Sequence, residues 1–311
     1  MAWLEFTVDT AAANIETVAA SLTAGGFSDL VMEDQNEFED FLDQNREYWD
    51  YIDEELQQQL RGLSRIKLYL EDTDTAGREK LETLVARLGL NMTAAPLPDV
   101  DYEESWKDSY PPQPIGERLL VLPCWLADSD SDGRLPVILD PGLTFGTGAH
   151  PSTQMVMEAM EELVSPGAAC LDLGSGSGIL SIAALRLGAS RAIGVDIDPT
   201  AESIARENAA YNGFADPEFT ALTGNVTADK DLMEQLAKNS YDVVLVNIVA
   251  DVIIGLAPVL PHFLTGNTNL ICSGILDTRL PDVLAALTAA GLTVTGIREK
   301  EDWRCVTAKK E

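Results

Sequence analysis

The feature that most constrains the fold of this chain is the segment LDLGSGSGIL (171–180), in which an apolar strand passes through alternating glycines into an apolar helix. The glycines are Gly174, Gly176 and Gly178. Because they lack a Cβ atom, they let the backbone turn tightly and approach a ligand closely. The helix start beyond them offers N–H groups without partners inside the helix. The segment therefore predicts a ligand-binding turn of an α/β sheet.

Strands and helices alternate from residue 150 onward. Helices are expected after Pro151, from Ile179, and at 199–213, 250–260 and 279–291, between apolar strands at 170–173, 191–197, 241–248 and 268–274. This alternation predicts an α/β fold with a doubly wound, mostly parallel, Rossmann-like sheet. The closing strands at 293–299 and 303–310 are too close together for a helical crossover, so we expect an antiparallel hairpin at the edge of the sheet.

The first hundred residues follow the different order β-α-β-(α)-β-α-β. Strands are expected at 3–8, 29–34, 65–71 and 92–98, and helices at 11–27, 38–60 and 77–90. This order predicts a small ferredoxin-like α+β domain. Such an architecture serves many roles and does not indicate a function by itself.

A chain of 311 residues is long enough for two domains. We predict one domain at 1–99, a linker at 100–115 and a second domain at 116–311. The linker contains three prolines between positions 111 and 114 and leads into a strand at 119–125. The loop DSDSDGRLP (128–136) has the composition of a hairpin turn ahead of a strand at 137–140.

The chain is strongly acidic, with 51 Asp and Glu against 21 Lys and Arg and a formal net charge of −30. This charge repels phosphate backbones, so we expect no direct nucleic-acid binding, whereas a basic protein partner would be attracted. Residues 29–55 hold twelve acids against a single arginine. The preferred interpretation of this segment is a solubilising surface.

Targeting and cysteine patterns predict a cytoplasmic protein that is not bound to membranes. No basic segment followed by an apolar run begins the chain. The apolar stretch 243–260 is interrupted by polar residues and proline, which favours a buried strand running into a helix over a membrane span. The four cysteines lie far apart without a CxxC pair, so neither a disulfide framework nor a metal site is expected.

Two acidic residues near the glycine loop narrow the choice of ligand. Asp196 ends a strand eighteen residues beyond Gly178, where a carboxylate can accept hydrogen bonds from both ribose hydroxyls. Asp172 would repel a phosphate, and it could favour a cationic ligand or hold the loop through hydrogen bonds. The G-x-G-x-G spacing also differs from the G-x-G-x-x-G that suits pyrophosphate. S-adenosylmethionine, an adenosine with a cationic sulfonium, fits better than a nicotinamide cofactor.

Asn247 ends the strong apolar strand VVLVN, at the edge where open α/β sheets bind their ligands. A helix is expected directly after it, and Asn is a favoured N-cap residue. Taken alone, Asn247 is better explained as a helix cap.

Several segments taken together indicate a protein family more specifically than any one of these residues alone. PGLTFGTGAHPST (141–153), LDLGSGSGILSIAA (171–184), IGVDIDP (193–199) and NIVA (247–250), in this order, resemble the ribosomal protein L11 methyltransferase family of class I S-adenosylmethionine-dependent protein methyltransferases. The similarity extends over roughly residues 100–311, from ESWKDSYPPQPIGERLLVLPCW to the ending EDWRCVTAKK. The FGTGAHPST loop is its most specific part.

The resemblance implies that the chain methylates lysine side chains and the α-amine of ribosomal protein L11. It implies S-adenosylmethionine as the cofactor, held between the 141–153 loop and the glycine loop. The cofactor contacts that it implies are Thr153, Gly174, Gly176, Asp196 and Asn247. It also implies substrate recognition by the N-terminal domain, with 100–115 as a hinge, and a monomer.

The resemblance also bears on catalysis. Asn247 would aim the substrate amine, and Phe145 would line the methyl-transfer channel, although packing of the loop explains Phe145 equally well. For His150 a structural hydrogen bond at a helix start is preferred over a role as general base.

Other functions remain open at this point. Methylation of an amide or a nucleobase is disfavoured because Asn247-Ile248-Val249-Ala250 lacks the aromatic residue of the Asn-Pro-Pro-Tyr motif. Methylation of another protein amine, and a non-catalytic ribosome-assembly adaptor, are further alternatives. Asp196 and Asn247 argue against the adaptor, and the glycine spacing argues against a nicotinamide-dependent oxidoreductase.

Overall fold

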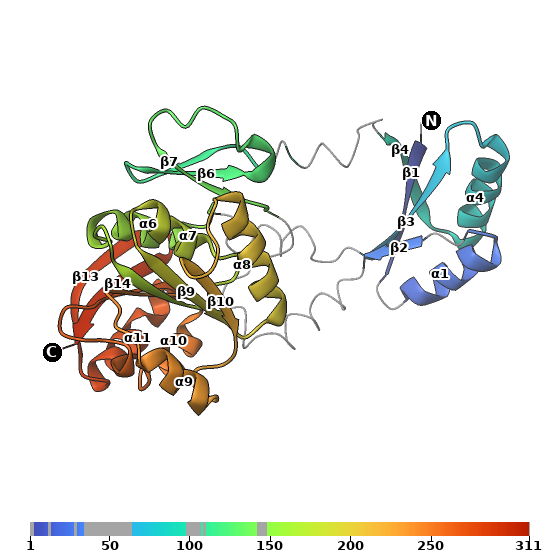
Figure 1. Ribbon diagram of the computed structural model, residues 1–311. Coiled ribbons are helices and arrows are strands. Elements are labelled where there is room, and N and C mark those ends of the chain that lie inside the picture. The colour runs from blue at the N-terminus through green and yellow to red at the C-terminus, as the bar shows by residue number, and fades with distance from the viewer. Residues whose placement is uncertain are drawn as a thin grey trace. The chain divides into compact units, whose positions relative to one another are not determined.

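The computed structural model describes residues 3–11, 14–27, 30–33, 64–97, 107, 110–141 and 148–310. These residues form two compact units, Met1–Ser109 and Tyr110–Glu311 (Figure 1). The predicted helix at 38–60, most of the acidic segment 29–55, and Phe145 lie outside the described residues.

The first unit is built on one antiparallel sheet. Its elements are β1 (Trp3–Thr10), α1 (Ile15–Ala24), β2 (Leu30–Glu33), β3 (Ser64–Glu71), α4 (Thr75–Leu88) and β4 (Asn91–Leu97), with the strand order β2-β3-β1-β4. Alternate residues of β1 and β3, such as Phe6 and Ile66, are buried together with Leu22 of α1 and Leu81 of α4. One face of the sheet is therefore covered by the two helices, and the ferredoxin-like prediction is confirmed.

The second unit contains a seven-stranded sheet with the order β10-β9-β8-β11-β12-β14-β13. Its strands are β8 (Ala169–Leu173), β9 (Arg191–Asp196), β10 (Phe219–Thr223), β11 (Val243–Asn247), β12 (Asn269–Leu276), β13 (Leu292–Lys300) and β14 (Trp303–Lys310). The strands from β10 to β12 are parallel, and β14 runs antiparallel to both β12 and β13. The doubly wound sheet and its antiparallel edge hairpin are confirmed.

Helices cover both faces of this sheet. They are α6 (Pro151–Leu163), α7 (Ile179–Arg186) and α8 (Pro199–Tyr211) on one face, and α9 (Lys230–Ala237), α10 (Ala250–Leu256) and α11 (Leu280–Ala289) on the other. All five residues of β8 are buried, as expected for a central strand covered on both faces. β10 and α9 were not predicted from the sequence, whereas the predicted division of 243–260 into a strand and a helix is confirmed.

A three-stranded sheet lies over α6, α7 and α8 (Figure 1). It consists of β5 (Gln113–Ile115), β6 (Leu119–Pro123) and β7 (Leu135–Leu139). β6 and β7 are parallel, with Leu119 opposite Leu135, so the hairpin predicted around 128–136 is wrong. A 3-10 turn at Cys124–Leu126 and a tight turn at Asp132 instead carry the chain back to the start of β6. Parallel neighbours need such a return connection.

The order of strands reverses between β8 and β11. From β8 the chain proceeds to β9 and β10 on one side, and from β11 to β12 on the other. Ligands of open α/β sheets bind at the carboxyl ends of the strands at such a switch point. Gly174 follows β8 and Asn247 ends β11, so the fold places both at this position. Within the described ranges no helix is long and apolar enough to cross a membrane.

Candidate active site

The glycine loop joins β8 to α7 through three residues with left-handed backbone angles. The φ angles of Gly174, Gly176 and Gly178 are 78°, 49° and 79°. A Cβ atom on Gly174 would lie 2.4 Å from Cγ2 of Ile248, and one on Gly178 would lie 3.0 Å from Cβ of Ala205. The loop therefore requires glycine for its backbone conformation and for its packing. The lack of side chains also leaves the backbone open to a ligand.

Asp196 lies at the end of β9 beside this loop. Its Oδ2 accepts a hydrogen bond of 2.8 Å from the backbone N–H of Gly176, and its Oδ1 accepts one of 3.0 Å from the N–H of Asp198. Asp198 in turn caps α8, accepting a bond of 2.8 Å from Thr200 N–H. Each carboxylate oxygen retains further acceptor capacity. Asp196 is thus held in a fixed orientation with room for ligand hydroxyls.

Asn247 meets Thr153 of α6. Its Nδ2 donates a hydrogen bond of 3.1 Å to the Oγ1 of Thr153, which is fully buried. The Oδ1 of Asn247 is also buried but has no hydrogen-bond partner among the described residues. The N-cap of α10 is Val249, so the interpretation of Asn247 as a helix cap is wrong. A buried acceptor without a partner is costly unless a ligand completes it.

Gly274 in β12 fixes the turn after Asn247. The N–H of Ile248 donates to the carbonyl of Ser273 at 3.1 Å. Gly274 has a φ of 82°, and a Cβ atom there would lie 2.4 Å from the carbonyl oxygen of Ile248. Gly274 was not among the residues predicted from the sequence. A glycine inside the apolar strand LICSGIL was the available signal, since it marks a close backbone approach.

His150 has a structural role at the start of α6, as predicted. Its Nδ1 accepts a hydrogen bond of 3.3 Å from the N–H of Ser152 and lies 2.7 Å from the Ser152 hydroxyl. Its ring packs edge-on against Trp303 with 4.5 Å between centroids. Burial lowers the pKa of His150, although nearby Glu301 opposes the change. The imidazole is thus favoured in its neutral form.

Asp172 is fully buried below the glycine loop. Its Oδ2 accepts hydrogen bonds from the N–H and the hydroxyl of Ser181, at 3.2 and 2.8 Å. Its Oδ1 is buried without a partner in the described part of the chain. Burial raises the pKa of Asp172 to about 7, against the lowering effect of the Ser181 bonds and with a small contribution from Asp196. Both of these bonds go to Ser181 in the first turn of α7, so Asp172 is attached to the helix that follows the glycine loop.

The residues at the switch point fit an adenosine ligand. Glycines allow close approach, Asp196 can receive ribose hydroxyls, and the unpartnered Oδ1 of Asn247 needs a donor. Ile197, which the sequence analysis missed, is 62% exposed beside Asp196 and offers an apolar surface for a base. Across the described ranges no cluster of three or more His, Cys, Asp or Glu could hold a metal ion.

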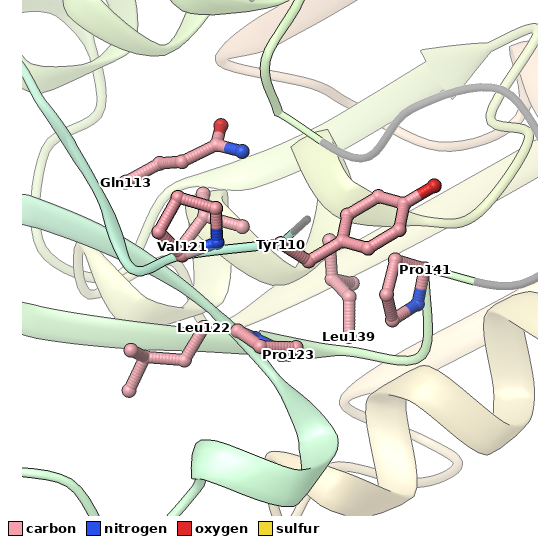
Figure 2. Close-up of a pocket in the computed structure, with 8 residues that line it drawn as sticks. Tyr110, Gln113, Val121, Leu122, Pro123, Leu139 and Pro141 are labelled. Atoms are coloured by element: carbon pink, nitrogen blue, oxygen red, sulfur yellow. The ribbon is translucent and has the colours of Figure 1, made fainter. Parts of the chain in front are cut away.

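A separate small pocket lies at the end of β7 (Figure 2). It is lined by Tyr110, Pro111, Gln113, Val121, Leu122, Pro123, Leu139 and Pro141. Figure 2 shows the ring of Tyr110 and the amide of Gln113 on different sides of it. Of the predicted site residues that the structure describes, none lines this pocket, and most of its lining residues are apolar. Among the described residues, the groups suited to chemistry therefore lie at the switch point.

Known proteins resemble the chain over its whole length. A family model described as "Ribosomal protein L11 methyltransferase (PrmA)" matches residues 2–311. A protein of that name from Heliobacterium modesticaldum is 33% identical over 320 residues, which cover 100% of this chain and 98% of that protein. One from Alkaliphilus metalliredigens is 34% identical and covers 99% and 98%. The crystal structure of a ribosomal protein L11 methylase from Lactobacillus delbrueckii subsp. bulgaricus is 29% identical with a TM-score of 0.58, covering 65% of this chain and 100% of that one.

Proposed function

Because the chain belongs to the ribosomal protein L11 methyltransferase family, we propose that it transfers methyl groups from S-adenosylmethionine to amine nitrogens of ribosomal protein L11. The amines are lysine side chains and the α-amine. One structural observation carries most weight for the reaction. The Oδ1 of Asn247 is a buried acceptor that has no partner among the described residues, at the switch point and beside the glycine loop.

The cofactor would be held by residues from four separate segments. Gly174 and Gly176 present backbone at close range, Asp196 is oriented for the ribose, and Thr153 and Asn247 complete the site. Bound S-adenosylmethionine supplies a methyl group on a positively charged sulfur. The protein's part is then to orient the two reactants and exclude water, which can supply much of the rate acceleration of a displacement reaction.

The substrate amine must lose its proton before it can attack. Free lysine has a pKa of about 10.4, and an apolar site with a nearby positive charge lowers that value. Asn247 can accept a hydrogen bond from the neutral amine through Oδ1 and so aim the nitrogen lone pair. The Nδ1 of His150 is engaged at the start of α6. We therefore assign no general base, and the proton leaves to water.

The turn after Asn247 supports an amine over a planar amide or base. The side chain of Ile248 lies against Gly174, where a Cβ would approach it to 2.4 Å. Neither Ile248 nor the following Val249 and Ala250 provides an aromatic wall on which a planar group could stack. The site is thus better suited to a flexible amine than to glutamine or a nucleobase.

The partner would be a basic ribosomal protein, and the net charge of −30 supports this choice. The N-terminal unit would recognise the substrate, with 100–115 as the hinge between the units. With a ribosomal protein as its substrate, the reaction would take place in the cytoplasm. The same negative charge favours a monomer, because copies of the chain repel one another. The proposed reaction and partner require no contact with nucleic acid or a membrane.

The experiment that tests the proposal uses S-adenosylmethionine with a radiolabelled methyl group. The protein is incubated with purified ribosomal protein L11 and, in parallel, with an unrelated basic protein of similar size. The modified residues are then located by mass spectrometry. We expect label on lysine or α-amino nitrogens of L11 only. Cofactor binding without label on L11 would contradict the proposal and favour the adaptor.

A further inference from the structure

Helix α8 carries two buried amide side chains one turn apart. Asn208 is fully buried and Asn212 is 6% exposed. Buried amides are retained only where their hydrogen bonds are satisfied. Neither residue is among the predicted cofactor contacts.

Asn208 connects the glycine loop to the residue that directly precedes the 141–153 loop. Its Nδ2 donates a hydrogen bond of 2.8 Å to the carbonyl of Ser177 in the glycine loop. Its Oδ1 accepts one of 2.9 Å from the N–H of Asp140, directly after β7. The chain from Asp140 leads toward Gly148 and α6, which carries Thr153. A single rigid amide therefore sets the distance between the glycine loop and the end of β7.

The helix that carries Asn208 is itself fixed to the site. The backbone and Cβ of Ala205 pack against Gly178, where a Cβ would come within 3.0 Å. At the start of α8, the N–H of Asp198 is bound to the carboxylate of Asp196. Ala205 and Asn208 are three residues apart and so lie on the same side of the helix. The glycine loop is thus held from α8 at two neighbouring points.

We propose that Asn208 is a positioning residue of the methyltransferase site, which sets cofactor affinity by holding the Ser177 peptide and the end of β7 at a fixed separation. This inference rests on the proposed function. Loss of the amide removes the hydrogen bonds that it makes to the buried carbonyl of Ser177 and to the part-buried N–H of Asp140. The loop around Ser177 contains glycines with wide backbone freedom, so it moves to recover a hydrogen bond. The backbone of the loop beside the carboxylate of Asp196 moves with it.

Asn212 provides a matched control. Its Nδ2 donates to the carbonyls of Ile138 and Asn208, at 2.6 and 2.8 Å. Its Oδ1 accepts from the N–H of Ile138 at 2.9 Å and from the Arg186 guanidinium at 3.2 Å. Asn212 therefore joins α8 to β7, as Asn208 does, but none of these hydrogen bonds reaches the glycine loop. A replacement here removes more hydrogen bonds than one at Asn208 and leaves the loop's own anchor in place.

The test compares Asn208→Leu with Asn212→Leu and the wild type. Calorimetry gives the Kd for S-adenosylmethionine, thermal unfolding gives Tm, and steady-state methylation of L11 gives KM and kcat. We expect Asn208→Leu to raise Kd and the KM for the cofactor by about tenfold or more, with kcat at saturating cofactor within about threefold. Asn212→Leu should lower Tm at least as much while changing Kd by less than about twofold.

The outcomes separate positioning from mere stability. An unchanged Kd in Asn208→Leu, or an equal rise in Asn212→Leu, would overturn the inference. If Asn208→Leu fails to fold, Asn208→Asp serves in its place, because it keeps the acceptor for Asp140 and loses only the donor to Ser177. A wild type that binds no S-adenosylmethionine would overturn the proposed function as well. Normal binding by the wild type and by both Asn208 variants overturns this inference alone.

Discussion

Asn247 and Thr153 are 94 residues apart in the chain, yet the Nδ2 of Asn247 donates a hydrogen bond of 3.1 Å to the Oγ1 of Thr153. The Nδ2 side of the amide thus faces Thr153, and the buried oxygen Oδ1 has no partner among the described residues. Asn247 therefore offers an open acceptor, which is what an amine that donates an N–H requires.

The first prediction concerns this acceptor. Asn247→Ala should lower kcat for methyl transfer by about 100-fold, since a misplaced reacting group costs about that much. Thr153→Val removes the bond that orients the amide and should lower kcat by about tenfold. Initial rates with labelled cofactor at saturation measure both effects. Asn225, an exposed residue whose Oδ1 binds the N–H of Thr227, gives the control Asn225→Ala. Equal activity of Asn247→Ala and this control would contradict the assigned role.

The local parts of the site could be predicted from the sequence. The apolar run of β8, the glycines after it and the terminal Asp196 are contiguous signals, and the structure places them where α/β topology requires. Asn247 shows the limit of such signals. A helix follows it in the chain, so its local pattern matches an N-cap, and only the distant Thr153 reveals its orientation.

The direction of strand β7 also could not be predicted from the sequence. The turn residues of 128–136 are suited to a hairpin, but the direction of β7 is set by what it packs against. Its end is held by backbone bonds to Asn208 and Asn212 of α8, more than sixty residues later in the chain. β10 was missed because FTALT is short and only half buried, and so carries a weak pattern.

Gly274 leads to a prediction about backbone approach. Gly274→Ala places a Cβ within 2.4 Å of the Ile248 carbonyl oxygen at a φ of 82°. We expect the free energy of unfolding to fall by about 2–5 kcal/mol, from the left-handed conformation and the overlap together, and methyl transfer to fall with it. Gly291 has a similar φ of 78°, but a Cβ there meets no atom within 4 Å. Gly291→Ala should therefore cost only about 1–2 kcal/mol.

Denaturant unfolding of the two glycine variants tests this difference. Activity is measured at a temperature where both remain folded. If Gly291→Ala proved as damaging as Gly274→Ala, the backbone angle alone would be responsible. The close approach of Ile248 to β12 would then have no energetic importance.

Asp172 predicts a dependence of stability on pH. Its pKa of about 7 in the folded protein lies above the ordinary value of 3.8. Between these values the folded state binds a proton that the unfolded state has lost, so stability falls as pH rises from about 4 to about 7. The total effect is at most about 4 kcal/mol, and Asp172→Asn should remove it. The free energies of unfolding of the wild type and of Asp172→Asn are measured across this range. Their difference should change between about pH 4 and pH 7 and stay constant above pH 7. Parallel curves throughout would show that the Asp172 carboxyl is not perturbed.

The last prediction concerns Glu161, which attaches the three-stranded sheet to α6. Its carboxylate accepts hydrogen bonds from the N–H groups of Glu117, Arg118 and Leu119, at 2.9, 2.8 and 3.1 Å. Glu161→Ala leaves these donors without their charged acceptor and should lower the unfolding free energy by about 2–3 kcal/mol. The neighbouring Glu162 makes one exposed ion pair with Arg298 at 2.7 Å. Glu162→Ala should cost at most about 1 kcal/mol.

Comparing adjacent residues of one helix keeps charge change and helix propensity the same. Any difference in Tm between Glu161→Ala and Glu162→Ala therefore reports the three backbone bonds at the start of β6. The larger loss at Glu161 should also persist at high salt, because salt screens the exposed ion pair of Glu162 far more than it weakens short hydrogen bonds to backbone N–H groups. Equal losses, or a difference that vanishes with salt, would mean that Glu161 acts only through its surface charge.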